Sequence, residues 1–237
     1  MNKILDIYRR ISRKWMHMRL QPIHVYCLHH VCERFDAESM HECDWMALDE
    51  FKQKVLAMQQ SGVEFISLRE AHQRCKMEYV RCKRYAVLTF DDGYASLKEV
   101  LPWLKEQGIP CTLFINGKYM DGNSYRNMPS GTFLTWCDIK ELLYDGMTIA
   151  HHGAEYVDVS DMSSVSLHEF VELDIQNLKD NSNYIPFWAY TWGRHSLESD
   201  GILREYGITP VLIDGMKNYN NYLCIHRELR DMRCMLH

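Results

Sequence analysis

Two adjacent acidic residues carry the clearest chemical signal in the sequence. Asp91 and Asp92 follow the apolar run 85–90, which reads YAVLTF, and Gly93 comes next. Neighbouring side chains on an extended chain point in different directions, so one carboxylate can hold a divalent metal while the other takes a proton from water. An Asp-Asp-Gly sequence is also common at turns, where an Asp caps a helix. Its place at the end of a buried strand favours a catalytic site here.

Further polar clusters stand at the ends of other predicted strands. They are His29-His30, His151-His152 and Thr191-Trp192-Gly193. The carboxyl ends of the strands of a parallel barrel converge on one face, where active sites are built. We expect His29 and His152 in the site. His151 and His152 have a competing interpretation, as histidines that belong to the core or its rim. His30 is predicted to face the opposite side of its strand from His29.

The elements that must position these residues alternate between strands and helices from residue 22 onward. Strands are predicted at 23–28, 63–67, 85–90, 110–115, 147–151, 187–191, 208–213 and 222–229, the last one at an edge. Helices are predicted at 48–60, 68–74, 96–107, 138–144, 163–179 and 197–206, with a long loop over 117–134. This alternation predicts a single α/β domain over 21–237, a distorted or incomplete (β/α) barrel of about seven strands.

The net charge and the cysteines indicate which partners and which cellular compartment to expect. The 237 residues carry a net charge of −5, which argues against nucleic acid as the main partner. The nine cysteines include no CxxC pair, so we interpret them as reduced, structural thiols of a cytoplasmic protein.

The first 20 residues form a predicted amphipathic helix. Six lysines and arginines accompany a single acid, Asp6, and apolar residues recur at spacings of three and four. Such a helix can lie on an anionic membrane surface, or it can pack on its own domain with its charged side in solvent. The segment lacks the apolar core of a signal peptide. The expected location is therefore the cytoplasm, and the first interpretation adds peripheral contact with the inner face of the membrane.

The run from Thr89 to Tyr94, TFDDGY, resembles the first motif of the polysaccharide deacetylases, the NodB-like carbohydrate esterases. The segments 28–31, 101–104 and 135–152 resemble the branch that acts on poly-N-acetylglucosamine. The resemblance implies a distorted (β/α) barrel that removes acetyl groups from sugars with a divalent metal. Its motifs imply four roles: Asp91 as general base, His29 as general acid, and Asp92 and His152 as metal ligands.

Several positions depart from the family pattern. Tyr156 stands where the family has a second histidine ligand, and Glu155 beside it is an alternative oxygen ligand. Thr191 and Trp192 replace a proline and a tyrosine in the third motif, where the backbone amide at the Trp192 position holds the oxyanion in the family. No arginine stands at the matching place to hold Asp91, and Arg194 is a substitute close in sequence.

These departures leave three interpretations open. The protein is an enzyme whose metal is held by Asp92, His152 and either Glu155 or water; or an enzyme that works without a tightly held metal; or a pseudoenzyme that binds a glycan or a partner protein. For the first, the resemblance implies zinc, with cobalt or nickel as alternatives.

Aromatic residues near the expected site suit a sugar ligand. Tyr94, Tyr190 and Trp192 are the predicted substrate-binding residues, because aromatic rings stack on the apolar faces of sugar rings. A competing interpretation is that such rings only pack in the core. The expected partner is an acetylated sugar or a polysaccharide precursor made inside the cell, linked to a nucleotide or a lipid.

Overall fold

The computed structural model of the protein describes residues 21–38, 40–77, 83–122, 129, 131–219 and 223–229. The predicted N-terminal helix lies outside these residues. Among them, no helix is both long and apolar enough to cross a membrane.

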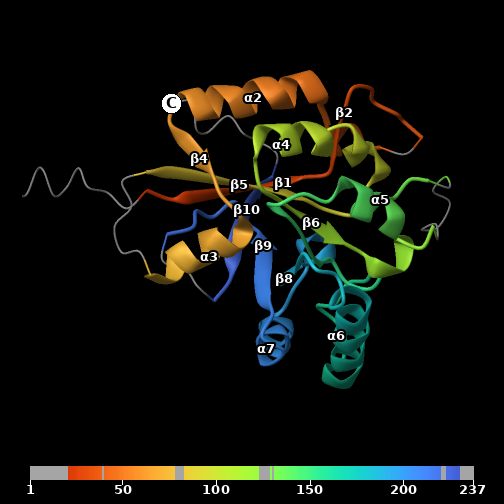
Figure 1. Ribbon diagram of the computed structural model, residues 1–237. Helices are drawn as coiled ribbons and strands as arrows, with labels where there is room; N and C mark the ends of the chain where they lie inside the picture. Colours follow the sequence, from red (N-terminus) through yellow and green to blue (C-terminus); the bar gives the residue numbers. More distant parts are fainter. Residues whose placement is uncertain are drawn as a thin grey trace, which may run out of the picture.

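Seven parallel strands form a closed barrel (Figure 1). In order around the barrel they are β1 (Ile23–Leu28), β10 (Ile225–Leu229), β9 (Thr209–Ile213), β8 (Tyr184–Ala189), β7 (Met147–His151), β6 (Cys111–Ile115) and β5 (Arg84–Phe90). The ring closes where β1 pairs with β5 over six residues, from Ile23 opposite Tyr85 to Leu28 opposite Phe90. The predicted α/β barrel of about seven strands is therefore confirmed.

The last strand differs from its predicted place at an edge. β10 lies between β9 and β1, and it pairs in parallel with both. The prediction rested on the strand's position at the end of the chain. β10 pairs with β1, which lies about 200 residues earlier in the sequence. The apolar spacing within a strand does not indicate which distant strand it pairs with.

The barrel is distorted next to β5. β4 (Val63–Phe65) pairs with the beginning of β5, at residues 84–86, whereas β6 pairs with its end, at residues 88–90. A second, two-stranded sheet joins β2 (His30–Cys32) to β3 (Trp45–Ala47). Sequence reasoning missed both of these strands, because neither shows the alternation of apolar and polar residues that marks β4 as Val63, Glu64 and Phe65.

Helices cover the barrel as the apolar spacing predicts. They are α2 (Leu48–Gln60), α3 (Leu68–Met77), α4 (Leu101–Gln107), α5 (Trp136–Leu142), α6 (Ser164–Leu178) and α7 (Leu197–Glu205). The predicted helix over 96–107 is divided into a 3-10 turn (Ala95–Lys98) and α4. Pro102 lies in the first turn of α4, where its missing N–H costs nothing, so it fits a helix start better than a helix interior.

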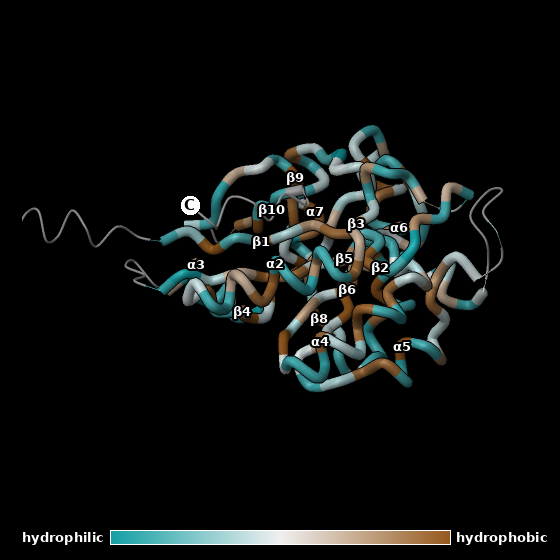
Figure 2. The backbone as a smooth tube through the Cα atoms, turned by 90° about the horizontal axis from the view of Figure 1, so that it is seen from above, coloured by the Kyte–Doolittle hydropathy of each residue, from teal (hydrophilic) through white to brown (hydrophobic). Residues whose placement is uncertain are grey.

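Side chains of alternate residues on each strand face the inside of the barrel or the helices. On β5, Tyr85 and Val87 belong to one buried cluster, with Val25, Phe114 and Ile225, while Ala86 and Leu88 belong to another. The hydrophobic stretches accordingly gather towards the middle of the molecule (Figure 2). The inward row on β5 continues through Thr89 to Asp91, so the period of two residues brings the Asp91 carboxylate into the mouth of the barrel.

Candidate active site

Asp91 is buried against an arginine from the last strand. The guanidinium of Arg227 donates from Nη1 to Asp91 Oδ1 at 2.5 Å and from Nη2 to Oδ2 at 2.8 Å. Both side chains are at most 1% exposed. Burial alone would raise the pKa of Asp91, but the charges of Arg227 and His152 outweigh it, and the net shift is downward. The pair therefore holds Asp91 as a carboxylate.

The arginine that holds Asp91 is not the expected Arg194. Arg194 instead donates to Asp158 at 2.9 Å, and 65% of its side chain is exposed. Arg227 was missed because it lies 136 residues from Asp91. The signal that could have found it is its position two residues after Ile225, on the inward row of a predicted strand, where an unpaired arginine would not be tolerated.

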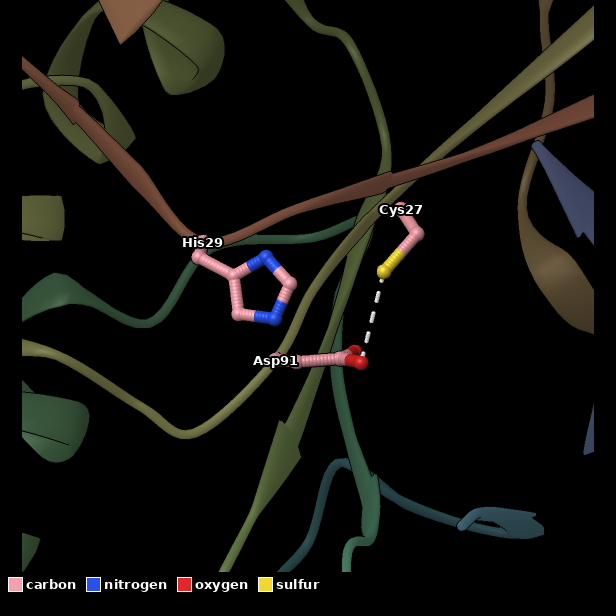
Figure 3. Close-up of side chains that lie close together, drawn as sticks. All are labelled: Cys27, His29 and Asp91. Carbon is pink, nitrogen blue, oxygen red and sulfur yellow. Dashed lines mark hydrogen bonds between the residues drawn. The ribbon is translucent and has the colours of Figure 1, made fainter. Parts of the chain in front are cut away.

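Cys27 and His29 approach Asp91 from β1 and the residues that follow it. The Cys27 thiol lies 3.4 Å from Asp91 Oδ2, and one ligand atom from each of Cys27, His29 and Asp91 lies within 4.8 Å of the others (Figure 3). Burial, the largest of the effects on Cys27, raises the pKa of this thiol well above its ordinary value. Cys27 is therefore a neutral donor to the carboxylate.

Asp92 and His152 face each other across 3.2 Å, measured from Oδ1 to Nε2. His152 is fixed by its other ring nitrogen, because Nδ1 donates to the carbonyl of Ala189 at 2.8 Å. His29 Nε2 lies 3.9 Å from Asp92 Oδ2. Burial would raise the pKa of Asp92, but its hydrogen bond with His152 and the charges of both histidines lower it well below the usual range. Asp92 is thus an ionised carboxylate beside an imidazole.

The backbone at Asp92 is in the left-handed region, with φ of 70°. Gly93 follows with φ of 71°. Asp92 and Trp192, with φ of 55°, are the two non-glycine residues in the described part of the chain that have positive φ. Both stand at the carboxyl ends of barrel strands, and strained backbone of this kind concentrates at functional sites.

The donor pair of Asp92 and His152 fits a metal ion. Two ligands that each approach an ion at about 2.0–2.2 Å, as carboxylate oxygen and imidazole nitrogen approach zinc, lie about 3.3–3.6 Å apart in a tetrahedral arrangement. The separation of 3.2 Å is slightly shorter, so a small outward shift of either side chain would admit the ion. The backbone carbonyl behind His152 supplies the outer hydrogen bond that orients a metal-binding imidazole.

The structure does not bring Glu155 against this pair. Its carboxylate accepts from Lys118 Nζ at 2.8 Å and is 42% exposed. The neighbouring Tyr156 points inward instead. Its ring packs edge-on against His152, with centroids 6.4 Å apart, and its phenol adds a small contribution to the low pKa of Asp92. A phenol therefore stands beside the pair on the side from which a third ligand was expected.

The three predicted substrate-binding aromatics lie in different surroundings. Tyr94 is 9% exposed and stacks between His30 and Phe133. Tyr190 is fully buried and donates to Asp200 at 2.7 Å. Trp192 is 57% exposed and stacks on Tyr156 with centroids 6.5 Å apart. Of the three, Trp192 is the exposed one, with the Arg194 guanidinium 6.0 Å from the centre of its ring.

His151 and His30, the sequence neighbours of His152 and His29, are hydrogen-bonded within the protein. His151 is fully buried, with Nδ1 2.8 Å from Asp174 and Nε2 2.8 Å from the Tyr184 hydroxyl. His30 lies 3.0 Å from the Ser96 hydroxyl through Nδ1.

Next to His29, a cavity of about 260 Å³ extends the site, lined also by Cys27, Leu28, His30, Cys43, Asp44 and Met46.

The fold of this chain is similar to those of several solved structures. The fold is similar to solved structures of IcaB from Ammonifex degensii (20% identity, TM-score 0.76, covering 88% of this chain and 91% of that one) and of the Streptococcus pyogenes deacetylase PplD in complex with acetate (21% identity, TM-score 0.76, 89% and 93%). It is also similar to a de-N-acetylase from Aggregatibacter actinomycetemcomitans (15% identity, TM-score 0.75, 90% and 96%).

No curated protein matches the sequence. The sequence model of the family described as polysaccharide deacetylase, however, matches residues 78–211, which is more than half of the chain. This stretch includes Asp91, Asp92, His152 and Trp192, and it leaves out His29 and Arg227. The chain therefore belongs to the polysaccharide deacetylase family.

Proposed function

We propose that this protein is a hydrolase that removes an acetyl group from an amino sugar or an acetylated glycan. Family membership supports the reaction class, and one observation supports competence above all. The buried Arg227 keeps Asp91 ionised next to the Asp92–His152 pair. A general base has to be deprotonated and fixed in place, and the arginine provides both conditions.

In the proposed reaction, Asp91 takes a proton from the attacking water, and His29 returns one to the leaving nitrogen or oxygen of the sugar. Asp92 and His152 would hold a divalent metal, which lowers the pKa of bound water and polarises the acetyl carbonyl. The backbone amide of Trp192 would donate to the developing oxyanion, a role that depends on backbone shape rather than on the side chain.

Zinc is the proposed metal, with cobalt and nickel as alternatives. An oxygen and a nitrogen ligand suit all three ions. The remaining ligands would be water molecules or Glu155, and Glu155 would first have to leave Lys118.

The proposed substrate is an acetylated sugar or polysaccharide precursor in the cytoplasm. The exposed ring of Trp192 and the cavity beside His29 support a sugar ligand. Peripheral membrane contact through residues 1–20 is part of the proposal. Loss of binding to anionic phospholipid vesicles after deletion of these residues would support it, and equal binding of both proteins would refute it.

Metal content is the decisive first measurement. Protein dialysed against zinc, cobalt or nickel should hold about one ion per chain, and Asp92→Ala and His152→Ala should each lose it. His168→Ala is the matched control, because His168 lies on α6 and contacts Tyr206. Equal metal content in all four proteins would reject the assigned ligands.

Acetate release from acetylated glucosamine oligomers tests the reaction itself. Asp91→Asn should abolish it, because an amide cannot accept the proton. The variant should also be less stable, because the buried Arg227 loses its counterion, so acetate release is measured on folded protein whose metal content equals that of the wild type. Asp158→Asn, on the surface beside Arg194, is the control. Retained activity in Asp91→Asn would mean that another group is the base.

A second candidate, a pseudoenzyme that binds glycans, is favoured by the buried phenol of Tyr156, which packs against His152 where the family has a second histidine ligand. It predicts sugar binding that depends on Trp192 without any acetate release. Calorimetric titration of chitin oligomers into the wild-type protein and Trp192→Ala measures this binding, and the acetate assay on the same oligomers separates the two functions.

A further inference from the structure

A second cluster of reactive side chains lies outside the proposed active site. His226 and Arg227 are neighbours on β10, so their side chains point to opposite sides of the barrel wall. Arg227 faces inward to Asp91, whereas His226 faces outward to Asp214, the residue that follows β9. Cys224, immediately before β10, lies beside the same imidazole.

The three side chains stand in a fixed order. The Cys224 Sγ lies 3.6 Å from His226 Nε2, and His226 Nδ1 lies 2.7 Å from Asp214 Oδ2. The carboxylate accepts the proton of Nδ1, which leaves Nε2 as the acceptor that faces the thiol. A nucleophile within reach of a base, which is itself oriented by a third group, is the arrangement that activates thiols and hydroxyls in covalent catalysis.

His226 is held firmly in this position. Its side chain is 10% exposed, its backbone N–H donates to Asn218 Oδ1 at 2.9 Å, and its carbonyl accepts from Asn218 Nδ2 at 2.6 Å. Asp214 is anchored as well, because its Oδ1 accepts from the backbone of Met216 at 3.0 Å. The base and its orienting group are thus preorganised.

The thiol needs such a base. Burial, followed by the charges of Asp200 and Asp214, raises the pKa of Cys224. At neutral pH the sulfur therefore keeps its proton until another group removes it. Two exposed cysteines lack this help: Cys43 and Cys137 each lie 3.6 Å from a carboxylate oxygen, of Asp44 and Glu141 respectively.

We propose that Cys224, His226 and Asp214 form a nucleophilic thiol site that is modified by small α,β-unsaturated carbonyl compounds. The Cys224 sulfur attacks the β-carbon as His226 takes the thiol proton. A sulfur–carbon bond forms, the carbon–carbon π bond breaks, and its electrons move to the carbonyl as an enolate. The proton on His226 then passes to the α-carbon. The product is a thioether, no leaving group or oxidant is required, and the imidazole is regenerated.

The test is the rate of acrylamide addition to each cysteine of the full-length protein at neutral pH, measured by mass spectrometry of peptides after quenching. Cys224 should react about 10-fold faster than Cys43 and Cys137, although it is more buried, because a positioned base accelerates proton transfer. A rate at Cys224 equal to or below theirs would overturn the proposal.

Two variants separate activation from mere exposure. His226→Gln should lower the rate at Cys224 by about 100-fold and leave Cys43 and Cys137 unchanged, since general-base catalysis contributes a factor of that order. His168→Gln is the matched histidine control. Asp214→Asn, at a more exposed position, should lower the rate about 10-fold because the tautomer of His226 is no longer fixed. If His226→Gln does not fold, Asp214→Asn tests the proposal alone. An unchanged rate of acrylamide addition at Cys224 in Asp214→Asn would reject the triad.

Discussion

At the scale of single residues, the proposed chemistry depends most on the Asp91–Arg227 pair. Both groups are charged and almost completely buried, and each neutralises the other. Removing one partner of such a pair leaves an unpaired charge in the interior, at a cost of about 3–5 kcal/mol. Loss of Arg227 would therefore destabilise the barrel and also remove the charge that keeps the proposed base ionised.

Arg227→Lys tests whether the two-point contact matters. A lysine keeps the charge but cannot make both hydrogen bonds, so we expect acetate release to fall about 10- to 100-fold and stability to fall by about 1–3 kcal/mol. Arg194→Lys should change both quantities little, because this side chain is 65% exposed. Activity assays and urea unfolding of the two variants provide the comparison. Equal behaviour would show that the geometry of the guanidinium is unimportant.

His30 makes stability depend on pH. Burial, followed by the charge of His29, lowers the pKa of His30 to about 4. Between pH 6.5 and 4 the unfolded chain binds a proton at this position that the folded protein does not, so stability falls as the pH falls. The contribution of His30 should decrease by about 2 kcal/mol from pH 7 to pH 5.

The measurement is urea unfolding of the wild-type protein and of His30→Gln at pH 7 and pH 5. The wild type should lose about 2 kcal/mol more than the variant over this interval. His168→Gln serves as the control and should follow the wild type. A His30→Gln variant that loses as much stability as the wild type would show that His30 is protonated in the folded state.

At the scale of elements, the turn after β5 carries the strongest local constraint. Gly93 has φ of 71°, and an added Cβ would lie 2.9 Å from Ile115 Cγ2 and 3.2 Å from Met120 Cε. Gly108, at the end of α4, has a similar φ of 63° but no atom within 4 Å of the added Cβ. The two glycines share the backbone conformation and differ in the surrounding space.

Gly108→Ala should therefore cost about 1–2 kcal/mol, which is the strain of the left-handed backbone alone. Gly93→Ala should cost about 1–3 kcal/mol more, because Ile115 is fully buried and has no room to move. It should also weaken zinc binding, since the clash displaces the neighbouring Asp92. Urea unfolding and zinc titration measure the two effects. Equal costs at both positions would indicate that the packing around Gly93 is loose.

Long periodic elements were predictable from the sequence, and distant contacts were not. Leu48, Phe51, Val55 and Met58 recur at helical spacing, and they are the buried residues of α2, whose bounds match the prediction. The bounds of β1 also match the prediction, because a strand in the wall of a parallel barrel is buried on both faces and is therefore mostly apolar. These patterns depend only on nearby residues. They arise because a surface helix is buried on one face and a barrel strand on two.

In the candidate site, too, the residues at strand ends were predictable and the contacts between distant segments were not. Asp91, Asp92, His29 and His152 were predicted to converge, since strand ends meet at one face of a barrel, and the distances between their side chains agree. Arg227 was missed, because its partner lies across the barrel rather than along the chain. The inward turn of Tyr156 and the pairing of Glu155 with Lys118 depend on loop conformation, which no periodicity encodes.

At the scale of the whole molecule, the barrel depends on its last strand. Removal of residues 224–237 would expose the edges of β1 and β9 and would leave Asp91 without its counterion. We expect this truncated protein to be insoluble, because open strand edges pair with other chains. A control truncated after Leu229 keeps every strand of the barrel. A soluble, folded protein without β10 would show that the other strands suffice.

The pairing of β1 with β10 also fixes when the protein can finish folding during its synthesis. The ribosome completes Asp91 well before it makes Arg227, 136 residues later. Until that arginine emerges, any compact intermediate holds an acidic group without its partner and an unsealed gap between two strands. We therefore expect the barrel to stay open until the end of translation. Closing the barrel and pairing the proposed base with its counterion are then a single late event, so a chain that stops before Arg227 acquires neither.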